Sequence, residues 1–345
     1  MKNHDRIRRI IETNMRRAKT TLAGMDFPGI DSPDAVRMVI ELEGSDTSAA
    51  FELDPYWPKW TAPWWKVVIL DEMGLGECLN DAVLSKLEES LNNHYINFFP
   101  LQASEIPTGC DPYRHILCHC ALGTAFRILA KRNRSPWKKA LWTREWLTRY
   151  RLPDGGYNCD EQAYSRESPH SSFLSTLPPL EAMLEIHGGL TGDEVAALAG
   201  GADYLISRKL CRSISKGGKI IDSNWLEPVF PRYYDYDILR GLSFLSRWAL
   251  KTCSRLPLDA IEESVTVLAG RLDALGRMPV RKNAWAGTGT LYYQDDLWRN
   301  GGEAEMFSLM QKCLMTSPSP WLTSEWYETV AMLDQLDKQK LLGED

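Results

Sequence analysis

Ionisable side chains gather in a few short segments of this sequence, and two of them have the spacing of metal ligands. His115 and His119 stand four residues apart, so both rings would project from one face of a helix and share a metal ion. No Glu lies between them, which excludes the metalloprotease signature. A metal would need a further ligand from elsewhere. One hypothesis is zinc held by His119 with Cys159 and Asp160, which lie in a polar segment that also carries His170 as a possible ligand. The alternative is that at least one of the two histidines is buried in the helix core and hydrogen-bonded there.

That polar segment, from Cys159 to Ser175, holds the residue chosen as the main candidate for proton transfer. His170 follows Pro169 among polar neighbours, so it is not read as core filler. A neutral imidazole near pH 7 can accept or donate a proton. The alternative is a ring that bonds a backbone carbonyl in the first turn of a helix. Ser171 and Ser172 beside it are interpreted as helix caps.

Two acidic side chains stand together at the start of another predicted helix, in YYDYDILR. Asp235 and Asp237 could set each other's protonation state, as a general acid requires. Alternatively, Asp235 caps the helix and Asp237 pairs with Arg240 three residues on. The sequence therefore leaves both a catalytic and a structural interpretation open here.

Helical periodicity predicts the elements that must position these groups. Residues 112–132 and 234–251 each read as one helix that is apolar on more than one face, and such helices are usually buried. A further helix is expected to start near Thr176, because Pro178 and Pro179 are tolerated only in a first helical turn. Residues 286–303 are Gly-rich, polar and aromatic, and are expected to form a long loop that covers a site as a lid.

One motif recurs along the chain. Trp146-Leu147 precedes the turn Asp154-Gly155-Gly156-Tyr157; Tyr204-Leu205 lies 58 residues later and Val267-Leu268 another 63 residues on. With Arg151, the first copy resembles the repeat of triterpene cyclases, such as squalene–hopene cyclase, and of protein prenyltransferase β subunits. The resemblance covers roughly residues 60–335, with Arg in place of Gln and Tyr in place of Trp in the clearest copy.

The resemblance implies an all-α fold, the α/α toroid, in which inner helices form a barrel around a deep apolar cavity. Helix starts rich in aromatic and charged residues would then surround the cavity mouth. The substrate-binding residues expected there are Trp64, Trp65, Lys66, Tyr113, Tyr233, Tyr234, Arg240 and Trp326. The Asp-x-Asp-Asp acid of class II terpene cyclases is matched without its last residue, at Asp235 and Asp237. The Asp-x-Cys order of the prenyltransferase zinc site is not reproduced.

Composition and charge exclude several other classes of protein. The formal charge of −6 gives no basic field for nucleic acid, and no apolar run is long enough to span a membrane. Eight scattered cysteines indicate reduced thiols and a cytoplasmic location rather than a disulfide scaffold. We expect a toroid domain over residues 56–340 after an N-terminal helical extension, residues 1–55. That extension begins with a basic amphipathic helix, interpreted as a cap packed on the domain or, alternatively, as a peripheral membrane contact.

The expected function is a small-molecule enzyme that acts by acid–base chemistry on an isoprenoid-like or other apolar substrate, as a cyclase-like lyase or isomerase or as a transferase. The main residues would be His115, His119, His170, Asp235 and Asp237. Two alternatives stay open. One is a zinc-dependent enzyme on the same toroid, and the other is a non-catalytic ligand-binding or scaffold protein.

Overall fold

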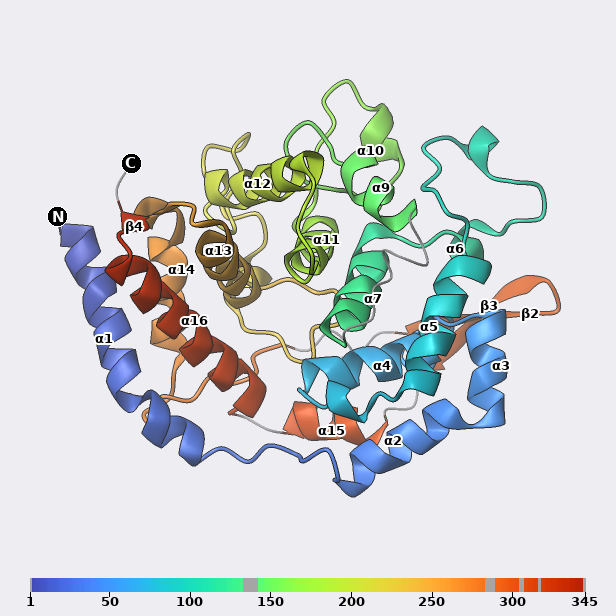
Figure 1. The fold of residues 1–345 in the computed structure, drawn as a ribbon, viewed down its shortest axis with the longest axis horizontal. Helices are drawn as coiled ribbons and strands as arrows, with labels where there is room; N and C mark the ends of the chain where they lie inside the picture. Colours follow the sequence, from blue (N-terminus) through green and yellow to red (C-terminus); the bar gives the residue numbers. More distant parts are fainter. Residues whose placement is uncertain (1, 133–141, 283–288, 304–306, 316–317, 344–345) are drawn as a thin grey trace. The chain divides into compact units, whose positions relative to one another are not determined.

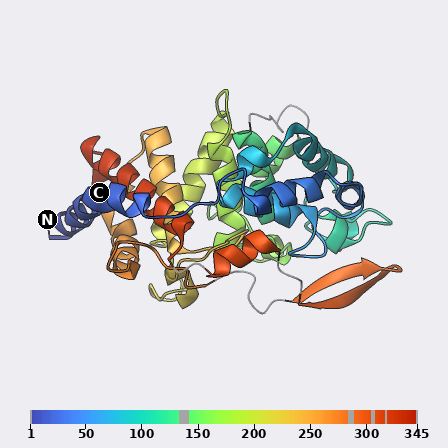
Figure 2. The same ribbon diagram turned by 90° about the horizontal axis from the view of Figure 1, so that it is seen from below.

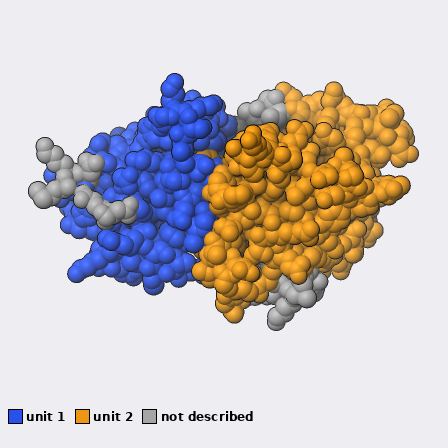
Figure 3. Space-filling view, turned by 90° about the horizontal axis from the view of Figure 1, so that it is seen from above, with its two compact units in different colours: residues 1–27, 199–284, 313–345 blue, residues 28–198, 285–312 orange. Residues whose placement is uncertain are grey.

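Helices dominate the part of the chain that the computed structural model describes, which is residues 2–132, 142–282, 289–303, 307–315 and 318–343. They make up 58% of the residues and strands 7%, which confirms the all-α class. The chain divides into two compact units: unit 1 is residues 1–27, 199–284 and 313–345, and unit 2 is residues 28–198 and 285–312 (Figure 3). This division does not follow the boundary predicted after residue 55.

Unit 1 is built on helices from both ends of the chain. Its elements are α1 (Lys2–Ala23), the C-terminal part of α12 (Gly192–Ser207), η3 (Ser223–Leu226), α13 (Ile238–Thr252), β1 (Leu256–Pro257), α14 (Leu258–Arg271), the end of α15 (Ser308–Met315), α16 (Pro320–Lys338) and β4 (Leu342–Gly343). Strands β1 and β4 form a short parallel pair. The helix predicted over residues 234–251 is confirmed as α13, which starts four residues later, at Ile238, and packs against α14 and α16.

Helix α1 is the amphipathic segment of the sequence, and it runs along α16 (Figure 1). Its apolar stripe is buried there, with Ile7 and Ile11 only 1% and 2% exposed. The Asn14 side-chain oxygen accepts a hydrogen bond from the Trp326 indole at 3.1 Å. This is the packing that the cap-helix interpretation predicts, and it removes the stripe from contact with a membrane surface. None of the described helices combines the length and apolar composition needed to cross a bilayer.

Unit 2 holds the polar segments around Cys118 and Cys159. Its elements are α2 (Pro33–Glu43), α3 (Ser45–Leu53), α4 (Pro63–Glu72), η1 (Gly76–Cys78), α5 (Asp81–Asn93), η2 (Ala103–Glu105), α6 (Pro112–His115), α7 (His119–Lys131), α9 (Trp142–Arg149), α10 (Gln162–Ser165), α11 (Phe173–Leu184), the start of α12, β2 (Gly289–Gln294), β3 (Leu297–Glu303) and most of α15. Helices α7 and α11 lie side by side within this unit (Figure 1).

The single helix predicted over residues 112–132 is wrong, because the chain is extended from Ile116 to Cys118 between α6 and α7. The Ile96 N–H donates to the His115 carbonyl at 2.9 Å, which takes the oxygen that a continuing helix would use. The break also separates the two histidines, so they do not share a helix face. It leaves Cys118 as the N-cap residue of α7.

Helix α11 begins at Phe173, capped by the Ser172 hydroxyl, three residues before the predicted start. Pro178 and Pro179 therefore lie inside the helix rather than in its first turn. They face Gly123 of α7, where an added Cβ would come within 2.4 Å of the Pro178–Pro179 backbone. Only a residue without a side chain permits this approach, so Gly123 sets how closely the two helices pack.

The loop predicted over residues 286–303 is also wrong for the residues that the structure describes there. Strands β2 and β3 form an antiparallel hairpin (Figure 2). Asp295 and Asp296 make the turn, and both have left-handed backbone angles, φ 53° and φ 57°. That combination is the signature of a type I′ turn, which Asp tolerates and which matches the twist of hairpin strands. Residues 286–288 lie outside the described part of the chain.

Candidate functional site

Three cysteines of unit 2 meet where α7 begins. Cys118 is the N-cap of α7, Cys120 lies in its first turn, and Cys159 comes from the segment between α9 and α10. The Sγ atoms of Cys118 and Cys120 are 3.0 Å apart, and those of Cys120 and Cys159 are 3.7 Å apart. All three Sγ atoms lie within 4.8 Å of one another. We call these residues the thiol cluster.

Cys159 reaches the cluster because the chain before it is pinned to the first turn of α11. The Tyr157 N–H donates to the Thr176 hydroxyl at 2.9 Å, and the Cys159 N–H donates to the Ser175 hydroxyl at 3.0 Å. At Gly156, an added Cβ would lie 2.4 Å from the Thr176 hydroxyl oxygen, so a larger residue would push the segment away. The DGGY turn and the close packing of α7 on α11 together set the position of the third thiol.

The spacing of the sulfurs fits a small thiophilic metal ion. Sulfurs at the corners of a tetrahedron, each about 2.3 Å from zinc, lie about 3.8 Å apart. The cluster has one pair at 3.7 Å and keeps all three within 4.8 Å, so a side-chain adjustment of under about 1 Å would complete three zinc bonds. Among the described residues, no fourth Cys, His, Asp or Glu offers a ligand atom within that distance of all three.

The three thiols of the cluster differ in how readily they lose a proton. Hydrogen bonds from Cys120 and Cys159 hold the pKa of the Cys118 thiol well below its ordinary value, outweighing burial, and the α7 N–H groups act in the same direction. The hydrogen bond to Cys118 raises the pKa of Cys120, and the hydrogen bond to Cys118 raises the pKa of Cys159 to about 12. Cys118 is therefore the first of the three thiols to lose its proton.

The cluster borders a cavity of about 620 Å³ within unit 2. Its walls are mainly aromatic and aliphatic. The lining residues are Tyr56, Trp57, Lys59, Tyr95, Phe99, Pro100, Gln102, Ala103, Ile106, Pro112, Tyr113, Ile116, Leu117, Cys118, Ala121, Cys159 and Glu161. The buried Tyr95 hydroxyl has no hydrogen-bond partner among the described residues. A hollow of this size, apolar with a few polar groups, has the make-up of a small-molecule site.

The β2–β3 hairpin contacts the same wall of unit 2. The Trp298 ring packs edge-on against Trp57 and Tyr113, with centroids 5.4 and 5.7 Å away, and its indole N–H donates to the Asp111 carboxylate at 3.0 Å. The Arg114 guanidinium lies 4.5 Å from the Tyr293 ring centroid. The hairpin therefore steadies two aromatic residues that line the cavity, which is a narrower role than the predicted lid.

The predicted metal ligand His119 does not belong to the cluster, although it follows Cys118 directly. Its ring is fully buried among aromatic side chains, 4.6 Å from Phe99 and 5.5 Å from Tyr157 between centroids. Burial lowers the pKa of His119 to about 4, so the imidazole is neutral. His115 lies apart, accepting a hydrogen bond from the Asp111 N–H at 2.8 Å through Nδ1.

The two other predicted residues of the 159–175 segment face solvent. Asp160 is exposed and pairs with Arg166 at 3.3 Å, while its Oδ1 accepts from the Gln162 N–H. His170 is also exposed, with Nε2 at 3.3 Å from Arg166. Of the predicted set Cys159, Asp160 and His119, the structure therefore keeps only Cys159 as a cluster ligand, because the turn after it directs the next side chain outward.

The acidic pair of unit 1 is held in a buried ionic network. Asp237 is fully buried, caps α13 through the Arg240 N–H at 2.9 Å, and binds the Arg232 guanidinium through both oxygens at 2.8 and 3.0 Å. Arg232 also pairs with Glu325. Asp235 pairs with Lys282 at 2.8 Å. The predicted Asp237–Arg240 contact is thus a backbone cap, and these partners favour the structural interpretation of both acids.

The predicted substrate-binding residues separate in the structure. Only Tyr113 lines the cavity, and it is 66% exposed. Trp64 and Trp65 are 2% and 0% exposed in the core of unit 2, and Lys66 pairs with Glu41 at 2.8 Å. In unit 1, the remaining predicted residues are buried or half-buried: Tyr233, Tyr234, Arg240 and Trp326.

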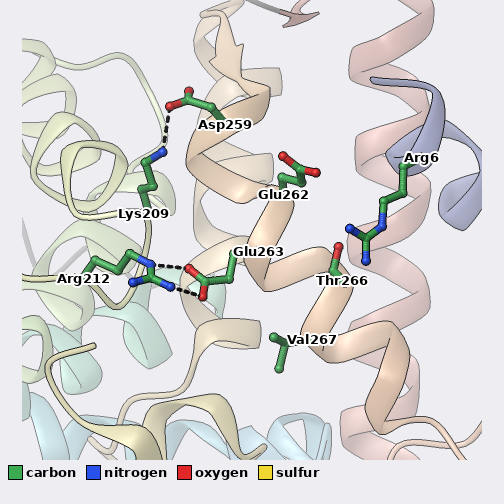
Figure 4. A pocket seen from close by; sticks show the side chains of 8 residues that line it. All are labelled: Arg6, Lys209, Arg212, Asp259, Glu262, Glu263, Thr266 and Val267. Carbon is green, nitrogen blue, oxygen red and sulfur yellow. Dashed lines mark hydrogen bonds and ion pairs between the residues drawn. The ribbon is translucent and has the colours of Figure 1, made fainter. Parts of the chain in front are cut away.

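A second hollow, of about 420 Å³, lies in unit 1 between α1, α14 and the chain after α12 (Figure 4). Its charged side chains largely neutralise one another. Lys209 pairs with Asp259 at 3.1 Å, and Arg212 binds Glu263 through both carboxylate oxygens. Arg6 from α1 borders the same hollow. These pairs account for the charges structurally, so the thiol cluster and its cavity are the candidate site.

Sequence reasoning missed two ligands and most of the cavity wall. Cys118 and Cys120 were not among the predicted ligands, although a Cys-x-Cys pair beside His119 was the available signal. Trp57, Lys59 and Phe99 carry no motif, and they reach the cavity through tertiary packing alone. The sequence matches no protein-family model and no curated protein, and the fold matches no solved structure.

Proposed function

We propose that the protein is a zinc-dependent enzyme for a small, mainly apolar molecule, with zinc held by Cys118, Cys120 and Cys159. The observation that carries the proposal is the meeting of three sulfurs at near-tetrahedral spacing beside a cavity. Thiolates select zinc over harder divalent ions, and tetrahedral sulfur sites are typical of zinc. Cys118 would lose its proton most readily, and metal binding would displace the protons that remain on the three thiols.

The number of ligands favours catalysis over a purely structural metal. Structural zinc sites are closed by four protein ligands, whereas catalytic sites have three and keep one position for water or substrate. The cluster supplies three, and Cys118 and Cys159 also line the cavity. The fourth position would therefore face the hollow. There zinc would polarise an oxygen of the substrate or activate a water molecule for its attack.

The α/α toroid and an isoprenoid-like substrate remain part of the proposal in its finer form. The repeat motif supports them: Trp146 and Leu147 lie in α9, and the Tyr157 hydroxyl donates to the Leu147 carbonyl across the DGGY turn. The apolar wall of the cavity suits such a substrate. Because the three cysteines must stay reduced to bind zinc, a reducing compartment such as the cytoplasm is the expected location.

Metal analysis of protein purified without chelators tests the proposal. We expect about one zinc per chain, bound tightly enough to survive gel filtration. Replacing zinc with Co²⁺ should give the near-ultraviolet thiolate-to-cobalt charge-transfer band and the intense visible bands of a tetrahedral ion. The double variant Cys118→Ser, Cys159→Ser should lose both the metal and the bands.

Cys110→Ser is the matched control, since Cys110 is a half-buried free cysteine of the same unit outside the cluster. It should keep the zinc content of the unaltered protein. A metal-free protein in which mass spectrometry finds Cys120 and Cys159 joined by a disulfide would contradict the zinc proposal and make the cluster a redox pair. Zinc retained by the double variant would contradict the assigned ligands.

A further inference from the structure

Lys59 is the only Lys or Arg among the described residues that line the cavity. Its ammonium lies over two aromatic rings of the wall, 5.9 Å from the Tyr56 centroid and 5.3 Å from the Trp57 centroid. The residue is half-buried. Burial lowers the pKa of Lys59, while the charges of Cys118 and Cys120 oppose that change. The ammonium is therefore within electrostatic reach of the thiol cluster and borders the same hollow.

Lys59 brings a positive charge to a wall that is otherwise mainly aromatic and aliphatic. The thiol cluster, two of whose cysteines line the same cavity, would present a metal with an open position. An oxyanion of the ligand would be stabilised by both, since charged hydrogen bonds are stronger where water is excluded.

The other residues of the cavity wall indicate what the rest of the ligand is made of. Five aromatic rings line the cavity, from Tyr56, Trp57, Tyr95, Phe99 and Tyr113. Flat rings offer large apolar area and favourable edge and face contacts to another ring. A volume of about 620 Å³ is in the range of pockets that enclose a drug-sized molecule. The Tyr95 hydroxyl adds a hydrogen-bonding group in that wall.

We propose that the cavity binds a small ring-containing carboxylate, whose apolar body lies against the aromatic wall and whose carboxylate is held by Lys59 beside the metal. This inference rests on the proposed function, because the metal supplies the second contact to the carboxylate. It names the substrate class of that same site, and it makes Lys59 the residue that distinguishes an acid from its neutral analogues.

Isothermal titration of the zinc-loaded protein with two probes of nearly equal shape tests this. The probes are 2-naphthoate and 2-naphthamide, which differ in the charge of the polar end. We expect the unaltered protein to bind the carboxylate roughly tenfold more tightly than the amide. Lys59→Met should abolish that preference with little change in the amide's Kd, and Lys59→Arg should restore part of it. Lys66→Met, a lysine paired with Glu41 outside the cavity, should behave as the unaltered protein.

Equal binding of the two probes, or binding of neither, overturns the inference. A preference for the carboxylate that survives in Lys59→Met but disappears when zinc is removed also overturns the inference, because the metal alone then distinguishes the carboxylate from the amide. The zinc proposal would stand in that case. A Lys59-dependent preference in a protein that never binds zinc would support the role of Lys59 and defeat the proposed metal function. Near-ultraviolet circular dichroism of Lys59→Met checks that the aromatic wall is intact.

Discussion

Helices α7 and α13 begin in comparable ways, and the two beginnings serve different purposes. The N-cap residue of each helix has a side chain that could do chemistry, Cys118 in unit 2 and Asp237 in unit 1, although only Asp237 was predicted to do so. At α13 the carboxylate binds Arg232 through both oxygens and caps the helix, and it is fully buried. At α7 the sulfur is only half-buried and borders a cavity of about 620 Å³.

The difference shows how a polar helix start can be sorted into structure or site. A charge whose hydrogen-bonding capacity is taken by protein partners stabilises the fold and has little left for a ligand. A group that keeps part of its capacity toward a hollow has its chemistry available. By this criterion the start of α13 stabilises the fold, and the start of α7 belongs to the candidate site. The substitutions below are given in order of their expected effect on stability or on zinc binding, the largest first.

Asp237→Ala should have the largest effect on stability. It removes the partner of a buried guanidinium and the cap of α13, and breaking a buried ion pair costs about 3–5 kcal/mol. Urea unfolding followed by circular dichroism measures the loss. Asp259→Ala is the control, because its pair with Lys209 is 70% exposed on the acidic side and surface pairs contribute about 0–1 kcal/mol.

The same Asp237→Ala protein, examined at low denaturant concentration, also tests whether Asp237 is structural and the thiol cluster is the candidate site. If Asp237 is structural, the folded fraction should keep the zinc content and probe affinity of the unaltered protein. If the zinc proposal leads to a substrate, folded Asp237→Ala protein of normal stability that no longer turns over that substrate would return the acid to the catalytic role that its sequence motif suggested.

Gly123→Ala should have the next largest effect, and it acts on the site through packing alone. The new Cβ would meet the Pro178–Pro179 backbone at 2.4 Å, so α7 and α11 must separate. Overpacking of this kind costs about 1–3 kcal/mol. Because Cys118 and Cys120 stand on α7 while Cys159 is pinned to α11, zinc affinity should fall by about 10–100-fold, as when supporting contacts of a metal site are lost.

Gly192→Ala is the matched control for that change, since nothing lies within 4 Å of the Cβ it would add. Its stability should stay within about 0.5 kcal/mol of the unaltered protein or rise slightly, as expected for Gly→Ala at a compatible helical position. Competition with a chromophoric chelator measures zinc affinity in both variants. Equal zinc affinity in Gly123→Ala and Gly192→Ala would show that helix packing does not position the thiols.

Unit 2 also contains a buried group of ion pairs, around Asp71, and its contribution to stability should decrease at acid pH. Asp71 is 7% exposed and pairs with Arg127 at 3.1 Å and Lys131 at 3.3 Å. Burial acts to raise the pKa of Asp71, but Lys131 and Arg127 outweigh it and lower the pKa below 3.8. The stability from the ionised carboxylate is therefore present above the unfolded pKa and is lost as the pH falls through the folded one.

Asp71→Asn should start less stable than the unaltered protein at neutral pH, and the gap should narrow once the pH drops below about 4. The narrowing can be no steeper than about 1.4 kcal/mol per pH unit, the limit for one proton. Thermal or urea unfolding between pH 6 and pH 3 measures it. A gap that stays constant over that range would mean that Asp71 does not hold its charge through its partners.

Periodicity predicted the helical class and the core helix α13 well, because an apolar pattern of 3.6 residues reports local burial directly. It failed where a tertiary contact overrides the local pattern. The helix break after His115 depends on a hydrogen bond from Ile96, about twenty residues earlier, which the local sequence does not record. The β2–β3 hairpin was missed because its Asp-Asp turn lacks the glycine that usually marks a type I′ turn.

The candidate site was predictable in part for the same reason. Cys159 and Asp160 were chosen because they lie together in a polar segment, and the structure places Cys159 in the cluster. Asp160 points elsewhere, as neighbours along a chain generally do, and His119 was chosen for a helical spacing from His115 that the helix break removes. The two missing ligands stood beside His119 in the sequence. Their meeting with Cys159 depends on the approach of α7 to α11 at Gly123, which no local pattern reveals.

His170→Ala should have the smallest effect, although this residue was the main sequence-based choice for proton transfer. Its ring is exposed, and its contacts, to Arg166 at 3.3 Å and the Ser168 carbonyl at 3.4 Å, lie on the surface. Surface substitutions of this kind change stability by less than about 0.5 kcal/mol.

His170 is not among the residues that line the cavity, so zinc content and the Kd of 2-naphthoate should not change. Its backbone carbonyl, which accepts from the Asn158 side chain at 2.9 Å, survives the substitution and continues to hold the segment beside Cys159. If His170→Ala instead weakens zinc or probe binding by tenfold or more, the ring reaches the site in solution, and the rule that separates exposed from cavity-facing groups fails for the segment that supplies Cys159.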